Sequence, residues 1–228
     1  MGDTLGDEHD CFIPLGARPC AVSIIDAGFF YYVRRDFISD DVWSPALLEK
    51  FCDLIIPKYH WRFRTYYVDA YPPHNPRDLD GSREKRKNKD EKFREIERLD
   101  RFSAVRGESR NVEKPGFAMF ETLPEGIDIE PFRHHKIKIR RTEQKQVDVL
   151  LASLISRIAY SGESKHITLI AGDQDFIPAI EIAKNAGVII RLICHDSGSS
   201  KTSSFLKDVV DERKDAKDYF EKLKEDTV

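Results

Sequence analysis

Four aspartates are the residues whose type and position in this sequence could do chemistry. Asp173 and Asp175 directly follow the apolar run HITLIA, Asp26 ends the apolar run PCAVSIID, and Asp148 lies near the start of a strongly amphipathic segment. Carboxylates that meet at one place repel one another unless a counter-charge is present. Their oxygen atoms suit a hard divalent cation such as Mg²⁺ or Mn²⁺, which can activate water and stabilise charge that develops on a phosphodiester. The first hypothesis is therefore an acidic cation site.

Each of these aspartates also has a purely structural interpretation. Asp173 and Asp175 could cap the helix that follows them, because aspartate is a preferred residue at a helix N-terminus. Asp148 could interact with the dipole of its own helix, and Asp26 could be a turn residue before Gly28. Any one of these interpretations is reasonable alone, but four carboxylates that gather at one edge of a sheet favour a shared site.

The elements that must position the aspartates are short apolar runs that alternate with amphipathic segments. Strands are expected at 19–26, 61–68, 134–141, 166–171 and 188–194. Helices are expected at 29–37, 44–57, 83–102, 147–159 and 176–186. Apolar strands separated by helices predict a single α/β domain with a parallel sheet covered on both faces. In such sheets ligands bind at the carboxyl ends of the strands, where Asp26, Asp173 and Asp175 are expected.

The remaining segments give weaker signals. Residues 107–132 are expected to be rich in loops, with an uncertain strand at FAMFETL (117–123), and a Ser/Gly-rich stretch and a charged helix are expected after His195. The four cysteines have no metal-site spacing and are expected to be reduced thiols. The polar first ten residues do not form a secretory signal, and no apolar run approaches the ~18 residues that span a membrane. These features predict a soluble, cytoplasmic protein with no membrane partner.

Net charge does not by itself indicate a nucleic-acid partner, because 37 basic residues face 40 acidic ones and the formal charge is −3. A prediction of nucleic-acid binding must therefore rest on local basic segments. The run RHHKIKIRR, residues 133–141, has five lysines and arginines and no acid. The predicted nucleic-acid-binding residues are Lys136, Lys138, Arg140, Arg141 and Lys145, the first three on one face of a strand. The alternative for residues 133–141 is a solvated edge strand that its lysines protect from pairing. For a second basic run, residues 83–94, a solvated helix face is favoured over a binding surface.

Three stretches resemble the motifs of the NYN domain family, the LabA-like branch of the PIN-like nucleases. They are SIIDAGFFYY, KQVDVLLASL and LIAGDQDFIPAIEIAKNAGVII, and together they span residues 20–194. The resemblance implies an α/β fold of the Rossmann-like, PIN-like three-layer type with a central parallel sheet. It implies a domain at 19–196, preceded by a polar tail at 1–18 and followed by a Ser-rich loop and charged helix at 197–228.

The same resemblance implies a function. The chain would be a metal-dependent ribonuclease, provisionally an endoribonuclease, that uses Mg²⁺ or Mn²⁺ and leaves a 5′-phosphate on one product. Asp26, Asp148, Asp173 and Asp175 would be both the catalytic and the metal-binding residues. RNA would be the partner, and a homodimer is one option for the assembly.

The chain departs from the family pattern at several positions, and these departures keep a second hypothesis open. Gly28 and Phe29 stand where many relatives carry asparagine, Leu154 stands where many carry aspartate, and Ala171 replaces a frequent serine. The alternative is a catalytically weak or inactive NYN-fold module that binds nucleic acid. A phosphatase or DNA nuclease that uses the same acids is a third option.

Overall fold

The computed structural model describes residues 18–73, 81–116, 137–143, 145–198 and 200–225. No described helix has both the length and the apolar character needed to cross a membrane. The described cysteines, Cys20, Cys52 and Cys194, are free thiols.

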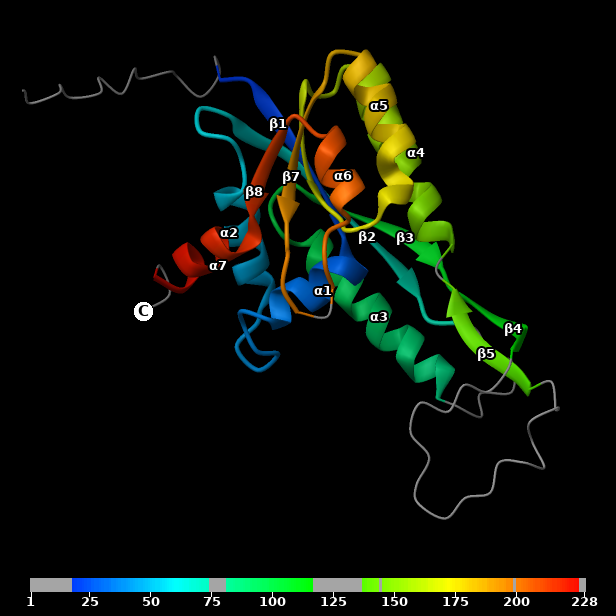
Figure 1. The fold of residues 1–228 in the computed structure, drawn as a ribbon. Helices are drawn as coiled ribbons and strands as arrows, with labels where there is room; N and C mark the ends of the chain where they lie inside the picture. The colour runs from blue at the N-terminus through cyan, green and yellow to red at the C-terminus, as the bar shows by residue number, and fades with distance from the viewer. Residues whose placement is uncertain (1–17, 74–80, 117–136, 144, 199, 226–228) are drawn as a thin grey trace, which may run out of the picture.

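A six-stranded parallel sheet forms the centre of the fold, with the order β3-β2-β1-β6-β7-β8 (Figure 1). Its strands are β1 (Cys20–Asp26), β2 (Trp61–Tyr71), β3 (Phe102–Glu108), β6 (His166–Ile170), β7 (Ile189–Cys194) and β8 (Glu212–Asp215). A separate antiparallel pair consists of β4 (Arg110–Gly116) and β5 (Ile137–Glu143). Figure 1 shows this pair projecting beyond the carboxyl ends of β2 and β3. The predicted α/β class and its parallel central sheet are confirmed.

Helices cover both faces of the sheet, and each face has its own core. On one face lie α1 (Ala27–Arg35), α2 (Pro45–Leu54), α3 (Ser82–Glu97) and α7 (Ala216–Glu225). On the other lie α4 (Lys145–Ser161), the 3-10 turn η3 (Gln174–Phe176), α5 (Ile177–Asn185) and α6 (Ser204–Val209). The stripe of α4 predicted from its spacing is buried at Val147, Leu151, Leu154, Ile155 and Ile158, whereas Val149 and Tyr160 on its other side are exposed.

The position of β1 creates a topological switch point in the sheet. β1 pairs with β2 on one side and with β6 on the other. The chain leaves β1 through α1 on one face and leaves β6 through η3 and α5 on the opposite face. The helices thus leave toward opposite faces at this switch point, the place where ligands commonly bind in open α/β sheets.

The structure corrects several predicted boundaries. The helix predicted at 83–102 ends at Glu97, and Phe102 begins β3 instead. The loops predicted at 107–132 contain the end of β3 and all of β4, while FAMFETL lies outside the described residues. β8 was not predicted, because ERKD carries no apolar residue. Both β3 and β8 are edge strands, whose partly exposed side chains give little apolar periodicity.

Candidate functional site

Asp26 lies at the carboxyl end of β1 and is the N-cap of α1. Its Oδ1 accepts hydrogen bonds from the backbone N–H groups of Gly28 (2.9 Å) and Phe29 (3.2 Å). Its Oδ2 has no hydrogen-bond partner in the part of the chain that the structure describes. Burial raises the pKa of Asp26 to about 6, the two backbone hydrogen bonds oppose this rise, and the charges of Asp148 and Asp69 add to it. Capping therefore occupies one carboxylate oxygen and leaves the other available to a ligand.

Asp173 occupies the equivalent place after β6. Its Oδ1 accepts the backbone N–H of Asp175 at 3.1 Å, so Asp173 caps the 3-10 turn η3 and not, as the structural interpretation had it, the following helix. Asp175 lies inside η3, and the following helix α5 has no side-chain cap. Both side chains are exposed at the edge of the sheet. As with Asp26, Oδ2 of Asp173 is not hydrogen-bonded to any described residue.

Asp148 joins these two strand ends electrostatically. It lies in the first turn of α4, and its pKa is raised by partial burial and then by the charges of Asp173 and Asp175. The charge of Asp148 in turn contributes to the raised pKa of Asp26. We refer to Asp26, Asp148, Asp173 and Asp175, which lie at the end of β1, in the first turn of α4 and at η3, as the acidic edge.

The donor chemistry of this edge fits a hard divalent cation. A cation would relieve the mutual repulsion, and three carboxylates, Asp26, Asp148 and Asp173, have oxygen atoms without a hydrogen bond to the described residues. Among the described side chains, however, no group of three or more histidine, cysteine, aspartate or glutamate residues converges closely enough to hold a metal ion. Mg²⁺ commonly binds through one or two carboxylates together with water and substrate phosphate, so a tight protein cage is not required.

Asp69 is a fifth acidic residue that the sequence analysis missed. It lies near the end of β2, beside β1, and is 7% exposed. Its Oδ1 accepts the N–H of Ala70 at 2.8 Å, and its Oδ2 forms an ion pair with Lys89 of α3. Both oxygen atoms are thus engaged, which makes Asp69 a neighbouring charge rather than an open ligand. Asp69 could have been found as the single aspartate within the apolar run YYVDAY. It was missed because the strand was predicted to end at residue 68.

The basic segment of α3 also differs from its predicted role as a solvated face. Lys89 pairs with Asp69, and Lys92 lies with its Nζ 5.6 Å from the centre of the Tyr67 ring. Burial, followed by the charge of Lys89, lowers the pKa of Lys92. The prediction is wrong for these two lysines, since both face the sheet near the acidic edge, whereas Arg83 and Lys87 are exposed as expected.

Gly172 allows the two halves of the acidic edge to approach each other. A Cβ atom at this position would overlap the ring of Phe29 in α1 and would lie 3.3 Å from the carbonyl oxygen of Lys201. The carbonyl of Gly172 accepts the N–H of Ser203 at 2.9 Å, which ties the acidic loop to the segment before α6. The glycine is therefore required for close packing between the loop after β6 and the start of α1.

Replacing Gly172 with alanine is expected to lower the free energy of unfolding by about 1–3 kcal/mol, because the added methyl group overpacks this contact. Denaturant unfolding of the purified variant measures the change. The double variant Gly172→Ala/Phe29→Leu is the matched test, since the smaller side chain makes room for the methyl group. An additive loss in the double variant would show that Phe29 is not the reason for the glycine.

The family departures have structural consequences of their own. Leu154 is buried in the core between α4 and the sheet and adds no polar group to the acidic edge. Ala171 is also fully buried, and Gly28 contributes its backbone N–H to Asp26. At these positions the chain has packing and backbone contacts in place of additional polar side chains.

The predicted nucleic-acid-binding residues lie on or beside β5. Lys138 and Arg140 occupy alternate positions of this strand, Arg141 follows them, and Lys145 begins α4 three residues before Asp148. Lys136 lies outside the described residues. β5 thus ends two residues before the start of α4, the helix that carries Asp148, while binding by these residues stays a prediction.

A comparison with protein-family models identifies the family. The model of the NYN domain matches residues 91–215, which is more than half of the chain and includes Asp148, Asp173 and Asp175. The match begins after Asp26, so the first of the three predicted motifs lies outside it. No match was found among curated proteins or among solved structures. The matched region contains β3 to β8 and three of the four aspartates, and this chain belongs to the NYN domain family of PIN-like nucleases.

Proposed function

We propose that the chain is a metal-dependent ribonuclease that hydrolyses phosphodiester bonds at the acidic edge. The observation that carries the proposal is the pair of open carboxylate oxygens, on Asp26 and Asp173, at the switch point of the sheet. Asp148 lies near both, because its charge raises the pKa of Asp26 and the charge of Asp173 raises the pKa of Asp148. Repulsion between carboxylates is unfavourable for folding, and carboxyl groups with raised pKa values are typical of functional sites. Membership of a nuclease family supports the same reaction class.

Each acidic residue has a distinct role in this proposal. Asp26 and Asp173 would hold a Mg²⁺ or Mn²⁺ ion through their Oδ2 atoms, and Asp148 or Asp175 would complete the site. The bound ion supplies electrostatic stabilisation of the charge that develops on the phosphodiester. Asp148, whose pKa is raised, is suited to accept a proton from the attacking water. The basic residues Lys138, Arg140, Arg141 and Lys145 would contact the phosphates of RNA as it approaches α4.

The test is cleavage of labelled single-stranded RNA by the purified protein with Mn²⁺ and with EDTA. We expect cleavage only with metal, and the variant Asp173→Asn should be about a hundredfold slower. Asparagine can still cap η3, so this variant should keep the unfolding midpoint of the wild type. Full activity of Asp173→Asn, or equal activity in EDTA, would exclude this mechanism. DNA and a phosphomonoester under the same conditions distinguish a ribonuclease from a DNA nuclease or phosphatase.

The second candidate is a nucleic-acid-binding module without catalysis. It is favoured by the apolar or small residues at Gly28, Leu154 and Ala171, where relatives often carry polar groups, and by the lack of three convergent ligands among the described side chains. This candidate predicts RNA binding that weakens with salt and is unaffected by EDTA, with no cleavage under any metal.

A further inference from the structure

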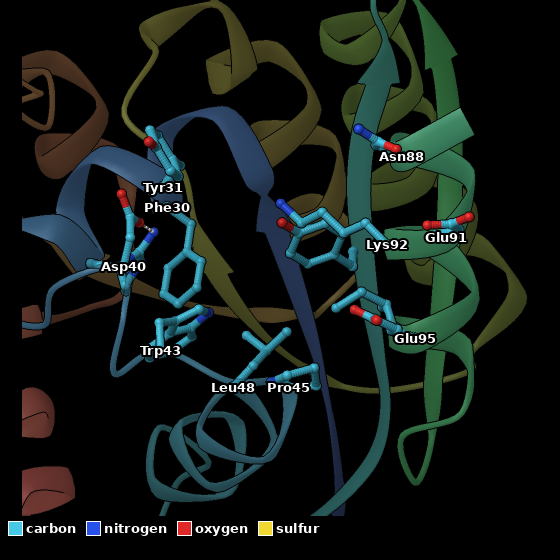
Figure 2. Close-up of a pocket in the computed structure, with 13 residues that line it drawn as sticks. Phe30, Tyr31, Asp40, Trp43, Pro45, Leu48, Asn88, Glu91, Lys92 and Glu95 are labelled. Atoms are coloured by element: carbon cyan, nitrogen blue, oxygen red, sulfur yellow. Dashed lines mark hydrogen bonds and ion pairs between the residues drawn. The ribbon is translucent and has the colours of Figure 1, made fainter. Parts of the chain in front are cut away.

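A cleft on the other side of α1 adjoins the acidic edge and has no role in the proposed reaction. It lies between α1, α2 and α3, with the floor formed by Tyr67 of β2, and has a volume of about 430 Å³. Figure 2 shows Phe30, Tyr31 and Trp43 on the side of α1, and Asn88, Lys92 and Glu95 on the side of α3. This volume suits a small ligand with one aromatic ring system.

The floor of the cleft is electrostatically connected to the acidic residues. The pKa of Tyr67 is raised by burial and then by the charges of Asp69 and Asp26. Lys92, which reaches over the Tyr67 ring, also interacts with the charge of Asp69. Tyr67 also directly precedes Val68, which pairs with Asp26 across β1 and β2. A ligand in the cleft would therefore lie beside the strand ends that carry the proposed cleavage site.

Lys92 is a cation without a carboxylate partner. It forms no ion pair or hydrogen bond with the described residues, although it is partly buried. The other cations near it are neutralised, because Lys89 pairs with Asp69 and Arg34 pairs with Asp40 on the opposite wall. A partly buried ammonium group that lacks a partner favours a ligand that brings its own negative charge.

The walls supply the remaining features of a binding site. The guanidinium of Arg34 lies 5.2 Å from the Tyr31 ring centre and 5.4 Å from that of Trp43, which holds both rings in place. From α3, the side chains of Asn88, Glu91 and Glu95 line the cleft without a hydrogen bond to the described residues. Amide and carboxylate groups of this kind can accept hydrogen bonds from the N–H edge of a base.

We propose that this cleft binds one nucleotide of the RNA strand, with its phosphate at Lys92 and its base against Tyr31 and Trp43. RNA is named as the ligand because this proposal rests on the proposed ribonuclease function. The residues of the cleft would recognise any nucleotide through its aromatic base and its phosphate. Carboxylate acceptors from Glu91 and Glu95 favour guanine, which offers two adjacent N–H donors, over uracil.

The test uses guanosine 5′-monophosphate as the probe, in EDTA so that no cation can hold its phosphate at the acidic edge. Trp43 lies in the cleft, so nucleotide binding should change the tryptophan fluorescence of the full chain. Tyr31→Ala and Lys92→Gln should each weaken binding about tenfold. The matched controls are Tyr160→Ala, an exposed tyrosine of α4 outside the cleft, and Lys87→Gln, an exposed lysine of α3 outside the cleft. Both should bind within twofold of the wild type. Unfolding midpoints confirm that all variants are folded.

The outcomes separate this inference from the proposed function. The proposed nucleotide binding in the cleft is rejected if the wild type does not bind guanosine 5′-monophosphate. It is also rejected if the variants and the controls weaken binding equally. A third outcome would also reject nucleotide binding in the cleft: RNA cleavage depends on Asp173, but its KM is unchanged in Tyr31→Ala and Lys92→Gln. The ribonuclease function would then stand. Nucleotide binding that follows the expected pattern in a protein that never cleaves RNA supports the cleft and rejects the ribonuclease function.

Discussion

Asp26→Asn is expected to make the metal-free protein more stable at pH 7 while it lowers RNA cleavage about a thousandfold. The stabilisation follows from burial, which raises the pKa of Asp26 from 3.8 to about 6. A shift of about two units corresponds to ~3 kcal/mol at most, and partial solvent contact reduces it to ~1–2 kcal/mol. Asparagine removes the buried charge and still caps α1. The loss of activity follows from the loss of a charged oxygen at the proposed cation site.

The gain in stability should depend on pH in a defined direction. Between about pH 4 and pH 6 the native protein keeps a proton on Asp26 that the unfolded chain has lost, so this residue makes the free energy of unfolding fall as the pH rises. Below about pH 4 both states are protonated, and the difference from the asparagine variant disappears. The advantage of Asp26→Asn should thus grow from pH 4 to pH 6 and then stay constant.

Denaturant unfolding in EDTA across this pH range, together with cleavage assays in Mn²⁺, measures both effects. The control is Asp208→Asn, an exposed aspartate of α6 whose ion pair with Arg213 spans 3.7 Å and should contribute little. A variant Asp26→Asn that is less stable than the wild type at pH 7 would contradict the burial argument. Stabilisation together with lost cleavage would identify Asp26 as a residue retained for function at a cost in stability.

Phe220→Ala is expected to lower the free energy of unfolding by about 3–5 kcal/mol, a large share of the ~5–15 kcal/mol typical of a domain. Phe220 lies in α7 and is 0% exposed. Its ring centre lies 4.7 Å from that of Phe51 and 4.9 Å from that of Phe37, and it also contacts Phe30 and Trp43. Removal of the ring leaves a cavity at the junction of α1, α2 and α7.

The matched control is Tyr160→Ala, which truncates an aromatic side chain that is 77% exposed and should change the free energy of unfolding by less than ~0.5 kcal/mol. Chemical unfolding followed by circular dichroism gives both values. A loss below ~1 kcal/mol for Phe220→Ala would mean that α7 packs only loosely. The expected large loss would instead make the last helix an integral part of the core beneath the proposed nucleotide cleft.

The sequence by itself determined the class of the fold and the principal acidic residues. The strand HITLI is buried at all five positions between β1 and β7. The apolar stripe of α4 packs as its spacing predicted. Both could be predicted because the spacing of apolar residues along the chain shows which side chains are buried. Since parallel strands place their carboxyl ends at one edge, the positions of Asp26, Asp173 and Asp175 followed from the same patterns.

Only the tertiary structure decided the rest of the site. β3 and β8 form because the edges of the sheet offer backbone hydrogen bonds to chain segments with little apolar pattern of their own. Asp69 joins the acidic edge through strand pairing, and Lys92 turns inward because α3 packs on the same face as α1. The cleft combines side chains from Phe30 to Ile96, contributed by α1, α2, α3, β2 and the loop between α1 and α2. Contacts between residues so distant in sequence arise from packing, and no local pattern encodes them.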